Sequence, residues 1–180
     1  MHSIHSQNIQ GHMYRGYEIL GLNGEREIVD YNSTERRPIW YVFSGMGSQW
    51  AGMGRELMMI PTFAASLRRC AKALEPCGID LIGLILTGNN ETYEDVLHSF
   101  VTIAAIQVAL VDVLSLLGIV PDGIVGHSVG EVGCAYADGT FTAEQAVLAA
   151  YWRGNSLKVS GLPDNMGKNL LLFENKNRVC

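Results

Sequence analysis

The fold is decided by Ile124-Val125-Gly126-His127-Ser128-Val129-Gly130, an apolar run that ends in a Gly-x-Ser-x-Gly pentapeptide. A turn at Pro121-Asp122-Gly123 precedes it, and a segment rich in small residues follows. Serine in this pattern lies on a strained turn between a strand and a helix, flanked by glycines because a side chain there would collide with neighbouring backbone. The pattern therefore predicts a nucleophile at Ser128. The alternative is a polar turn at the end of a strand, without chemistry.

Composition and charge narrow the class of protein. The chain has 180 residues, of which 48% are hydrophobic, enough for one domain with a buried core. Thirteen basic and eighteen acidic residues give a net charge of −5 without runs of one sign, which disfavours a nucleic-acid partner. The four cysteines show neither C-x-x-C spacing nor a dense disulfide framework, and the N-terminus shows no signal peptide. We therefore expect a cytoplasmic protein without a metal site.

The segment 100–120 is long and apolar enough to be tested as a membrane span. Gln107 and Asp112 lie near its middle, and an uncompensated aspartate at that depth costs about 2.5–3.5 kcal/mol on insertion scales. Gly118 and Pro121 then end the segment, as they end helices of soluble proteins. We interpret it as a buried helix and expect no membrane partner.

Short apolar runs predict the strands. Residues 39–43 form a β-branched and aromatic run, and residues 123–127 lead into the serine, so both are expected in a buried parallel sheet. Near the N-terminus, residues 17–22 are interpreted as an edge strand and residues 25–37 as a linker.

The segments between and after these strands predict helices. Residues 63–74 place four apolar side chains on one face, whereas residues 79–86 fit a helix and a strand equally well. Thr142 and Gln145 form a capping box that begins a helix ending at Arg153-Gly154. A helix expected after the first strand carries Met53, Leu57 and Met58. The predicted fold class is α/β, a doubly wound parallel sheet with helices on both faces.

A second glycine-rich turn, Gly45-Met46-Gly47, follows the first strand of the predicted sheet. A dinucleotide-binding loop would need a third glycine where Trp50 stands, and a Walker loop would need a Gly-Lys-Ser ending. Two interpretations remain. The loop could supply a second backbone N–H group to an oxyanion opposite Ser128, or it could be a tight turn without a ligand.

With both turns identified, the chain resembles the malonyl/acetyl acyltransferase domain of animal-type multifunctional fatty acid synthases, which is related to acyltransferases of polyketide synthases. The resemblance covers residues 38–154, and residues 1–37 resemble the end of the linker from a preceding ketosynthase domain. The matching pieces, in order, are Phe43-Ser44-Gly45-Met46-Gly47-Ser48-Gln49-Trp50, Gly126-His127-Ser128-Val129-Gly130-Glu131-Val132, Ala137-Asp138-Gly139 and Ala149-Ala150-Tyr151-Trp152-Arg153-Gly154.

The resemblance implies roles for five residues in acyl transfer through an acyl-serine. Ser128 would take the acyl group from coenzyme A, and the backbone N–H groups of Met46 and Val129 would form the oxyanion hole. Arg153 would pair with the free carboxylate of a malonyl group, and Phe100 would form an apolar wall that favours the animal branch and admits acetyl groups. The acceptor would be a phosphopantetheinyl acyl carrier protein, with other fatty acid synthase domains as partners and no bound cofactor.

The sequence departs from the family at the general base. The family takes its base from a histidine well downstream of the serine, beyond a ferredoxin-like subdomain, and no histidine follows His127 here. His127 itself should leave the backbone on the opposite side from Ser128. We expect an incomplete α/β-hydrolase-like sheet that lacks the ferredoxin-like subdomain, a divergent tail over residues 155–180, and little or no activity of this fragment alone.

Two alternatives are carried forward from the sequence. An α/β-hydrolase such as a thioesterase or carboxylesterase also displays Gly-x-Ser-x-Gly, but it needs an acid and then a histidine after the serine. A non-catalytic, truncated subunit of a dimeric synthase is the other alternative. Arg153 and the Met46 loop favour the transferase over the hydrolase.

Overall fold

The computed structural model describes residues 14–19, 25–30, 38–160 and 170–173, and the chain forms two compact units, Met1–Arg37 and Pro38–Cys180. In the first unit, β1 (Tyr14–Ile19) pairs antiparallel with β2 (Glu25–Asp30). The linker expected from residue 25 is therefore wrong over Glu25–Asp30, which pair along the whole length of β1. Residues 20–22 of the expected edge strand lie outside the described residues.

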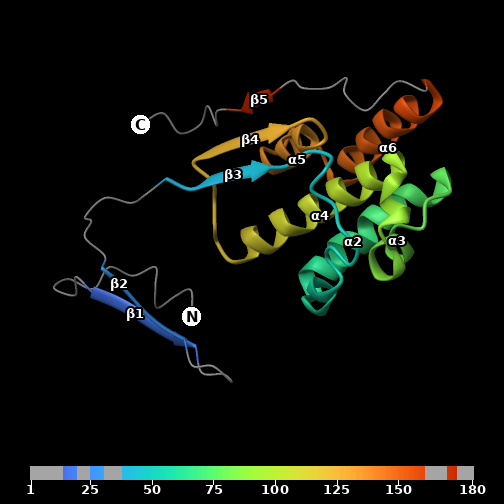
Figure 1. Ribbon diagram of the computed structural model, residues 1–180. Coiled ribbons are helices and arrows are strands. Elements are labelled where there is room, and N and C mark those ends of the chain that lie inside the picture. Colours follow the sequence, from blue (N-terminus) through green and yellow to red (C-terminus); the bar gives the residue numbers. More distant parts are fainter. Residues whose placement is uncertain (1–13, 20–24, 31–37, 161–169, 174–180) are drawn as a thin grey trace. The chain divides into compact units, whose positions relative to one another are not determined.

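The sheet of the second unit has the strand order β3-β4-β5. Strand β3 (Trp40–Phe43) runs parallel to β4 (Gly123–His127), with Trp40 opposite Gly123, so the predicted parallel pair is confirmed. Strand β5 (Leu170–Phe173) adds to the other side of β4 in the antiparallel direction, as Figure 1 shows. Both parallel strands end beside each other at the Ser128 turn.

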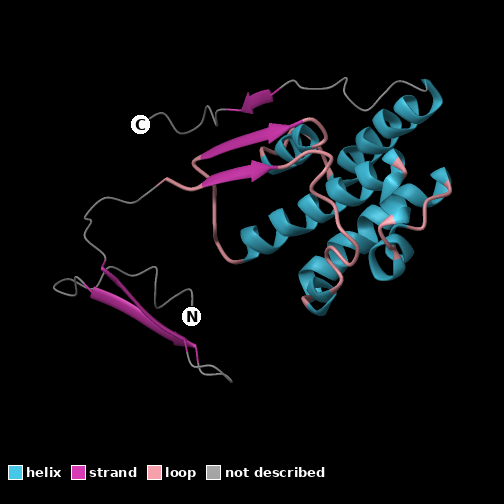
Figure 2. Cartoon of the chain, in the orientation of Figure 1, coloured by secondary structure: helices cyan, strands magenta, loops and turns pink. Residues whose placement is uncertain are grey.

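The described part of this unit also contains five α-helices and three short 3₁₀ helices, which loops and turns connect (Figure 2). The α-helices are α2 (Pro61–Leu74), α3 (Leu81–Thr87), α4 (Val96–Leu116), α5 (Gly130–Ala137) and α6 (Ala143–Ser160). The 3₁₀ helices are η1 (Glu56–Met59), η2 (Glu75–Cys77) and η3 (Glu91–Glu94). The helix expected over Met53, Leu57 and Met58 reduces to η1, which begins after Met53.

The predicted helix faces agree with the structure, whereas one helix end does not. The face of α2 formed by Phe63, Leu67, Cys70 and Leu74 is fully buried. The capping box is present: the Thr142 amide donates to Gln145 Oε1 at 2.8 Å, and the Gln145 amide donates to Thr142 Oγ1 at 3.2 Å. Helix α6 continues to Ser160 instead of ending at Gly154, because glycine is tolerated inside a helix that packs closely on its neighbour. The ambiguous segment 79–86 is mainly helix α3.

Helix α4 is the centre of the core. It is the one helix of the described residues that is long and apolar enough to cross a membrane, but residues 97 and 99–109 are all buried against protein. Asp112 is compensated, since its carboxylate accepts hydrogen bonds from Ser66, Arg69 and Tyr136. The interpretation of this segment as a buried helix is therefore confirmed.

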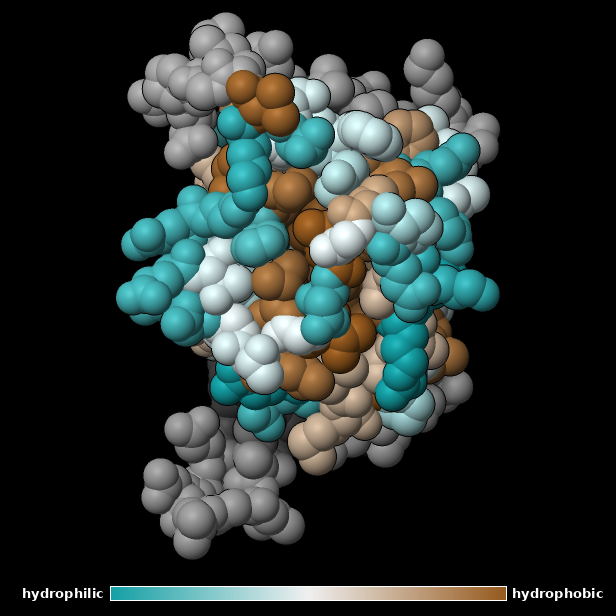
Figure 3. Space-filling view, turned by 90° about the vertical axis from the view of Figure 1, so that its right-hand side faces the viewer, coloured by the Kyte–Doolittle hydropathy of each residue, from teal (hydrophilic) through white to brown (hydrophobic). Residues whose placement is uncertain are grey.

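Helices cover one face of the sheet among the described residues. Tyr41, Phe43 and Ile124 pack with Val111 of α4 and Cys134 of α5. Val42, which points to the opposite face, is 72% exposed, so the expected second helical layer is not found within the described ranges. Hydrophobic side chains are also exposed on the face of the molecule that Figure 3 draws, where they are coloured brown.

Candidate active site

Ser128 lies on a strained corner between β4 and α5. Its φ of 56° is the one positive φ of a non-glycine residue among the described residues. Such a conformation costs of the order of 1 kcal/mol or more for a residue with a side chain, and it persists only when the surroundings enforce it. A Cβ at Gly130 would lie 2.1 Å from the backbone oxygen of Phe43, so glycine is required for the corner to reach β3. The predicted strand–turn–helix geometry is confirmed.

The loop after β3 lies directly against this corner. A Cβ at Gly45 would lie 2.6 Å from the carbonyl oxygen of His127 and 3.0 Å from Cβ of Ser128. Within the described ranges, neither the Met46 amide nor the Val129 amide donates a hydrogen bond to a protein acceptor. Both amides therefore have no protein acceptor in the described part of the chain, a condition that the expected oxyanion hole requires.

Gln107 anchors this loop, and sequence reasoning missed it. The side chain comes from the buried middle of α4, and its Nε2 donates to the carbonyl oxygen of Ser44 at 2.8 Å. Its Oε1 is buried and has no hydrogen-bond partner among the residues that the structure describes. The sequence did contain a sign of this role, because a side-chain amide inside an apolar helix needs a hydrogen-bond partner when it is buried.

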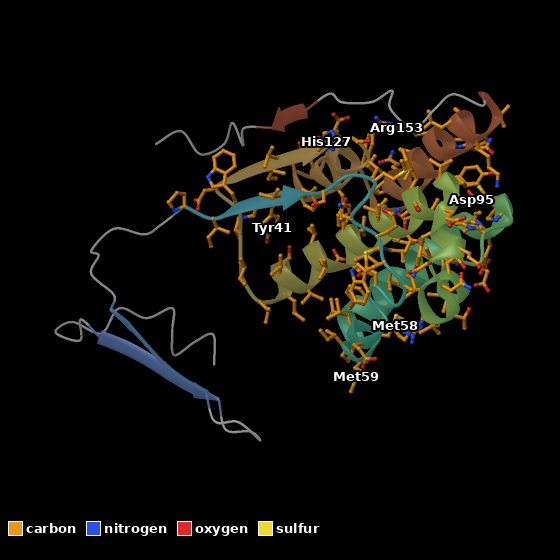
Figure 4. All side chains as sticks on the ribbon, in the orientation of Figure 1. Tyr41, Met58, Met59, Asp95, His127 and Arg153 are labelled. Atoms are coloured by element: carbon orange, nitrogen blue, oxygen red, sulfur yellow. The ribbon has the colours of Figure 1, made fainter. Side chains whose placement is uncertain are left out.

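Arg153 reaches the same corner from α6. Its Nη1 donates to the carbonyl oxygen of Ser128 at 3.1 Å, and its Cζ lies 6.0 Å from the ring centre of Phe100. Gly154 makes this approach possible, since a Cβ there would lie 3.1 Å from Cα of Leu97 in α4. The structure therefore brings Ser128, Arg153 and Phe100 together, and Figure 4 shows Arg153 near the end of the strand that carries His127.

Glu131 is a second residue of this site that the sequence did not reveal. Its Oε2 lies 3.5 Å from Nη1 of Arg153, and its backbone N–H donates to the carbonyl oxygen of Ser128 at 3.1 Å. The other carboxylate oxygen, Oε1, is buried without a partner in the described part of the chain. The resemblance motif contained Glu131, but only the tertiary contact with α6 shows what it touches.

The histidines among the described residues make no hydrogen bond to the Ser128 side chain, and Cys134 is buried. His127 is exposed at the end of β4, and His98 is partly exposed with Nδ1 3.2 Å from the carbonyl oxygen of Thr92. Cys134 is fully buried next to Gly126, and burial raises the pKa of its thiol to about 12, so it is not a thiolate nucleophile. No group of three metal-ligating side chains occurs among the described residues.

A groove of about 410 Å³ lies beside the site without containing it. It follows β3 and α4, with Trp40 and Leu114 among its apolar lining and with Ser44, Ser48 and Gln107 at its polar end. Ser128 and Arg153 do not line it. The groove therefore borders the loop that carries Met46, and the nucleophile is not part of its lining.

A serine on a strained strand–helix corner of an α/β sheet, with free backbone amides beside it, is the arrangement of serine-dependent acyl-transfer enzymes. The sequence model of the family described as "Acyl transferase domain" matches residues 40–180. The chain belongs to this family. The match extends through residues 155–180, the part expected to diverge.

Two curated relatives are polyketide synthases of fungi. The chain is 46% identical over 122 residues to "Highly reducing polyketide synthase SAT13" of Stachybotrys chartarum, and 40% identical over 140 residues to "Highly reducing polyketide synthase phiA" of a fungal species. These alignments cover 66% and 74% of the chain and 5% of each relative. The chain thus spans about a twentieth of these proteins, and they do not support the expected animal fatty acid synthase type.

Solved structures show the same fold. The acyltransferase domain of the polyketide synthase PpsC of Mycobacterium tuberculosis is 31% identical with a TM-score of 0.60, over 67% of this chain and 36% of that one. The malonyl CoA-acyl carrier protein transacylase of Coxiella burnetii is 28% identical with a TM-score of 0.63, over 70% of this chain and 40% of that one. The predicted acyltransferase fold is confirmed, and the chain covers only part of the domain.

Proposed function

We propose that this chain carries the nucleophile and the carboxylate-binding arginine of a malonyl-CoA:acyl-carrier-protein acyltransferase of a polyketide synthase. Family membership favours transfer over the hydrolase alternative. The relatives that are named as polyketide synthases support the synthase type, and Phe100, which suggested the animal type, is explained by its burial and its contact with Arg153. A solved malonyl-transacylase in complex with an acyl-carrier protein, 27% identical, supports the acceptor.

The reaction proceeds in two half-reactions. The Ser128 hydroxyl oxygen attacks the thioester carbonyl of malonyl-CoA, and the amides of Met46 and Val129 hold the negative charge of the tetrahedral intermediate. A general base moves the Ser128 proton to the departing sulfur, so coenzyme A leaves as its thiol and the malonyl group stays on Ser128 as an ester. The same base takes the proton of the carrier protein's phosphopantetheine thiol as this thiol attacks the ester, and returns it to the Ser128 oxygen. This chain has no histidine after His127 to act as that base, so the base must be supplied to it.

Arg153 selects the acyl group. Its guanidinium has five N–H donors in a planar fork, which suits bidentate binding of a carboxylate better than an ammonium does. The observation that carries the proposal is the 3.1 Å hydrogen bond from Arg153 Nη1 to the carbonyl oxygen of Ser128, because it fixes the cation within reach of an acyl group on that serine.

Equilibrium binding tests this assignment without requiring turnover. In a Ser128→Gly background, which removes the nucleophile and suits the positive φ, the chain should bind malonyl-CoA at least about tenfold more tightly than acetyl-CoA. Arg153→Ala should abolish that preference, and Arg153→Lys should restore only part of it. Lys158→Ala removes an equal charge from the same helix and should leave the preference intact. Equal binding of both thioesters by the Arg153 variant and its parent would refute the assignment.

A further inference from the structure

The carbonyl oxygen of Ser128 is the meeting point of a three-residue network. It accepts one hydrogen bond from the backbone N–H of Glu131 and one from Nη1 of Arg153, both at 3.1 Å. The Glu131 carboxylate closes the triangle, since its Oε2 lies 3.5 Å from the same Nη1. The first turn of α5 and the middle of α6 are therefore connected at the nucleophile.

The arginine keeps one edge of its guanidinium free in this network. Both of its polar contacts use Nη1, and neither Nη2 nor Nε donates to an acceptor among the residues that the structure describes. A planar guanidinium can offer two parallel N–H groups along such an edge to one carboxylate. A carboxylated acyl group can thus bind Arg153 while Glu131 stays in place.

Glu131 depends on this arginine for compensation. Its side chain is only 15% exposed, and its Oε1 is buried without a hydrogen-bond partner in the described part of the chain. A carboxylate in such surroundings is costly unless a cation is near it. Before any acyl group binds, the pair of Glu131 and Arg153 carries no net charge.

We propose that Glu131 is a specificity-determining residue, whose carboxylate neutralises Arg153 in the empty site and thereby lowers the preference for carboxylated over neutral acyl thioesters. This inference rests on the proposed function of Arg153. When a neutral acyl group binds, the pair remains balanced. When a malonyl group binds, its carboxylate shares one guanidinium with Glu131, and the two negative charges repel each other across it.

A substitution that removes the charge of Glu131 and keeps the shape of its side chain tests the inference. Glu131→Gln keeps an oxygen that can accept from Arg153 Nη1, so the arginine stays in position. In the Ser128→Gly background this substitution should raise the ratio of malonyl-CoA to acetyl-CoA affinity by about three- to tenfold, the range expected for one partly solvent-screened charge. Glu131→Asp keeps the charge and should leave the ratio within about twofold of the parent.

The controls separate this inference from the function on which it rests. Glu94→Gln, an exposed substitution in η3, changes the net charge equally and should leave the ratio unchanged. An unchanged ratio in Glu131→Gln would overturn the inference, and a lowered ratio would also overturn it, because it would show that Glu131 only holds Arg153 in position. If Arg153→Ala itself leaves malonyl-CoA binding unaltered, the proposed function fails instead. Urea denaturation of each variant verifies that it is folded.

Discussion

Replacing Gln107 by leucine should impair acyl transfer to Ser128 while leaving the stability of the chain intact. The Gln107 amide group is the one side-chain donor that the structure shows holding the carbonyl of Ser44, next to the loop that carries Met46. Leucine has a similar volume and fits an apolar helix interior. The substitution therefore releases the loop without opening a cavity in α4.

The magnitudes follow from the two polar atoms of Gln107. Loss of the 2.8 Å hydrogen bond to Ser44 costs about 0.5–1.5 kcal/mol, whereas removal of the buried, unpartnered Oε1 returns about 1–3 kcal/mol. The free energy of unfolding should thus stay constant or rise by about 1 kcal/mol. Complete loss of one oxyanion donor lowers turnover by about 10²–10³-fold, so a mobile Met46 amide should slow acylation by about tenfold.

Three measurements on Gln107→Leu examine this reasoning. Urea denaturation gives the stability, hydrogen exchange of residues 44–48 gives the mobility of the loop, and mass spectrometry gives the rate of Ser128 acylation by malonyl-CoA in buffer containing imidazole. Thr102→Val is the matched control, since Thr102 is another buried polar residue of α4, and its Oγ1 has no partner among the described residues. It should change neither exchange nor acylation. Parental acylation by Gln107→Leu, or a stability loss of several kcal/mol, would refute the argument.

Three further outcomes are expected. Imidazole should accelerate Ser128 acylation about tenfold or more by acting as the external base, because no histidine follows His127, and a rate independent of imidazole would contradict this. Asp112→Ala should lower the free energy of unfolding by about 1–3 kcal/mol, since Ser66, Arg69 and Tyr136 lose their acceptor while the half-exposed Arg69 stays solvated; a loss below about 0.5 kcal/mol in urea denaturation would show that the cluster is unimportant. Burial raises the pKa of the Cys70 thiol from 9.0 to about 12, and burial with a hydrogen bond to Asp112 raises the pKa of Tyr136 from 10.0 to about 12. The unfolded chain loses these protons at a lower pH than the folded chain does. The free energy of unfolding should therefore fall as the pH rises from 9 to 12, and an unfolding free energy that stays constant over this range would contradict the prediction.

Local patterns predicted the elements that depend on neighbours in the chain. The strand before Ser128, the capping box at Thr142 and the buried face of α2 were all correctly placed, because each follows from spacing within a few residues. The expected linker at Glu25–Asp30 was wrong. This segment mixes charged and apolar side chains without a clear strand pattern, and it forms a strand because it pairs with β1, an earlier segment of the chain. The end of α6 was also wrong, because Gly154 faces α4 instead of solvent.

The sequence by itself determined that a serine with flanking glycines would stand at a strand–helix corner, because only glycine fits where a Cβ would meet backbone. It also predicted the family, through motifs whose order and spacing are local properties of the chain. Only the tertiary structure decided that Gln107 holds the loop that carries Met46 and that Glu131 contacts Arg153. These contacts join residues from helices far apart in sequence, and a hydrogen bond or an ion pair forms only where packing brings its two partners within a few ångströms.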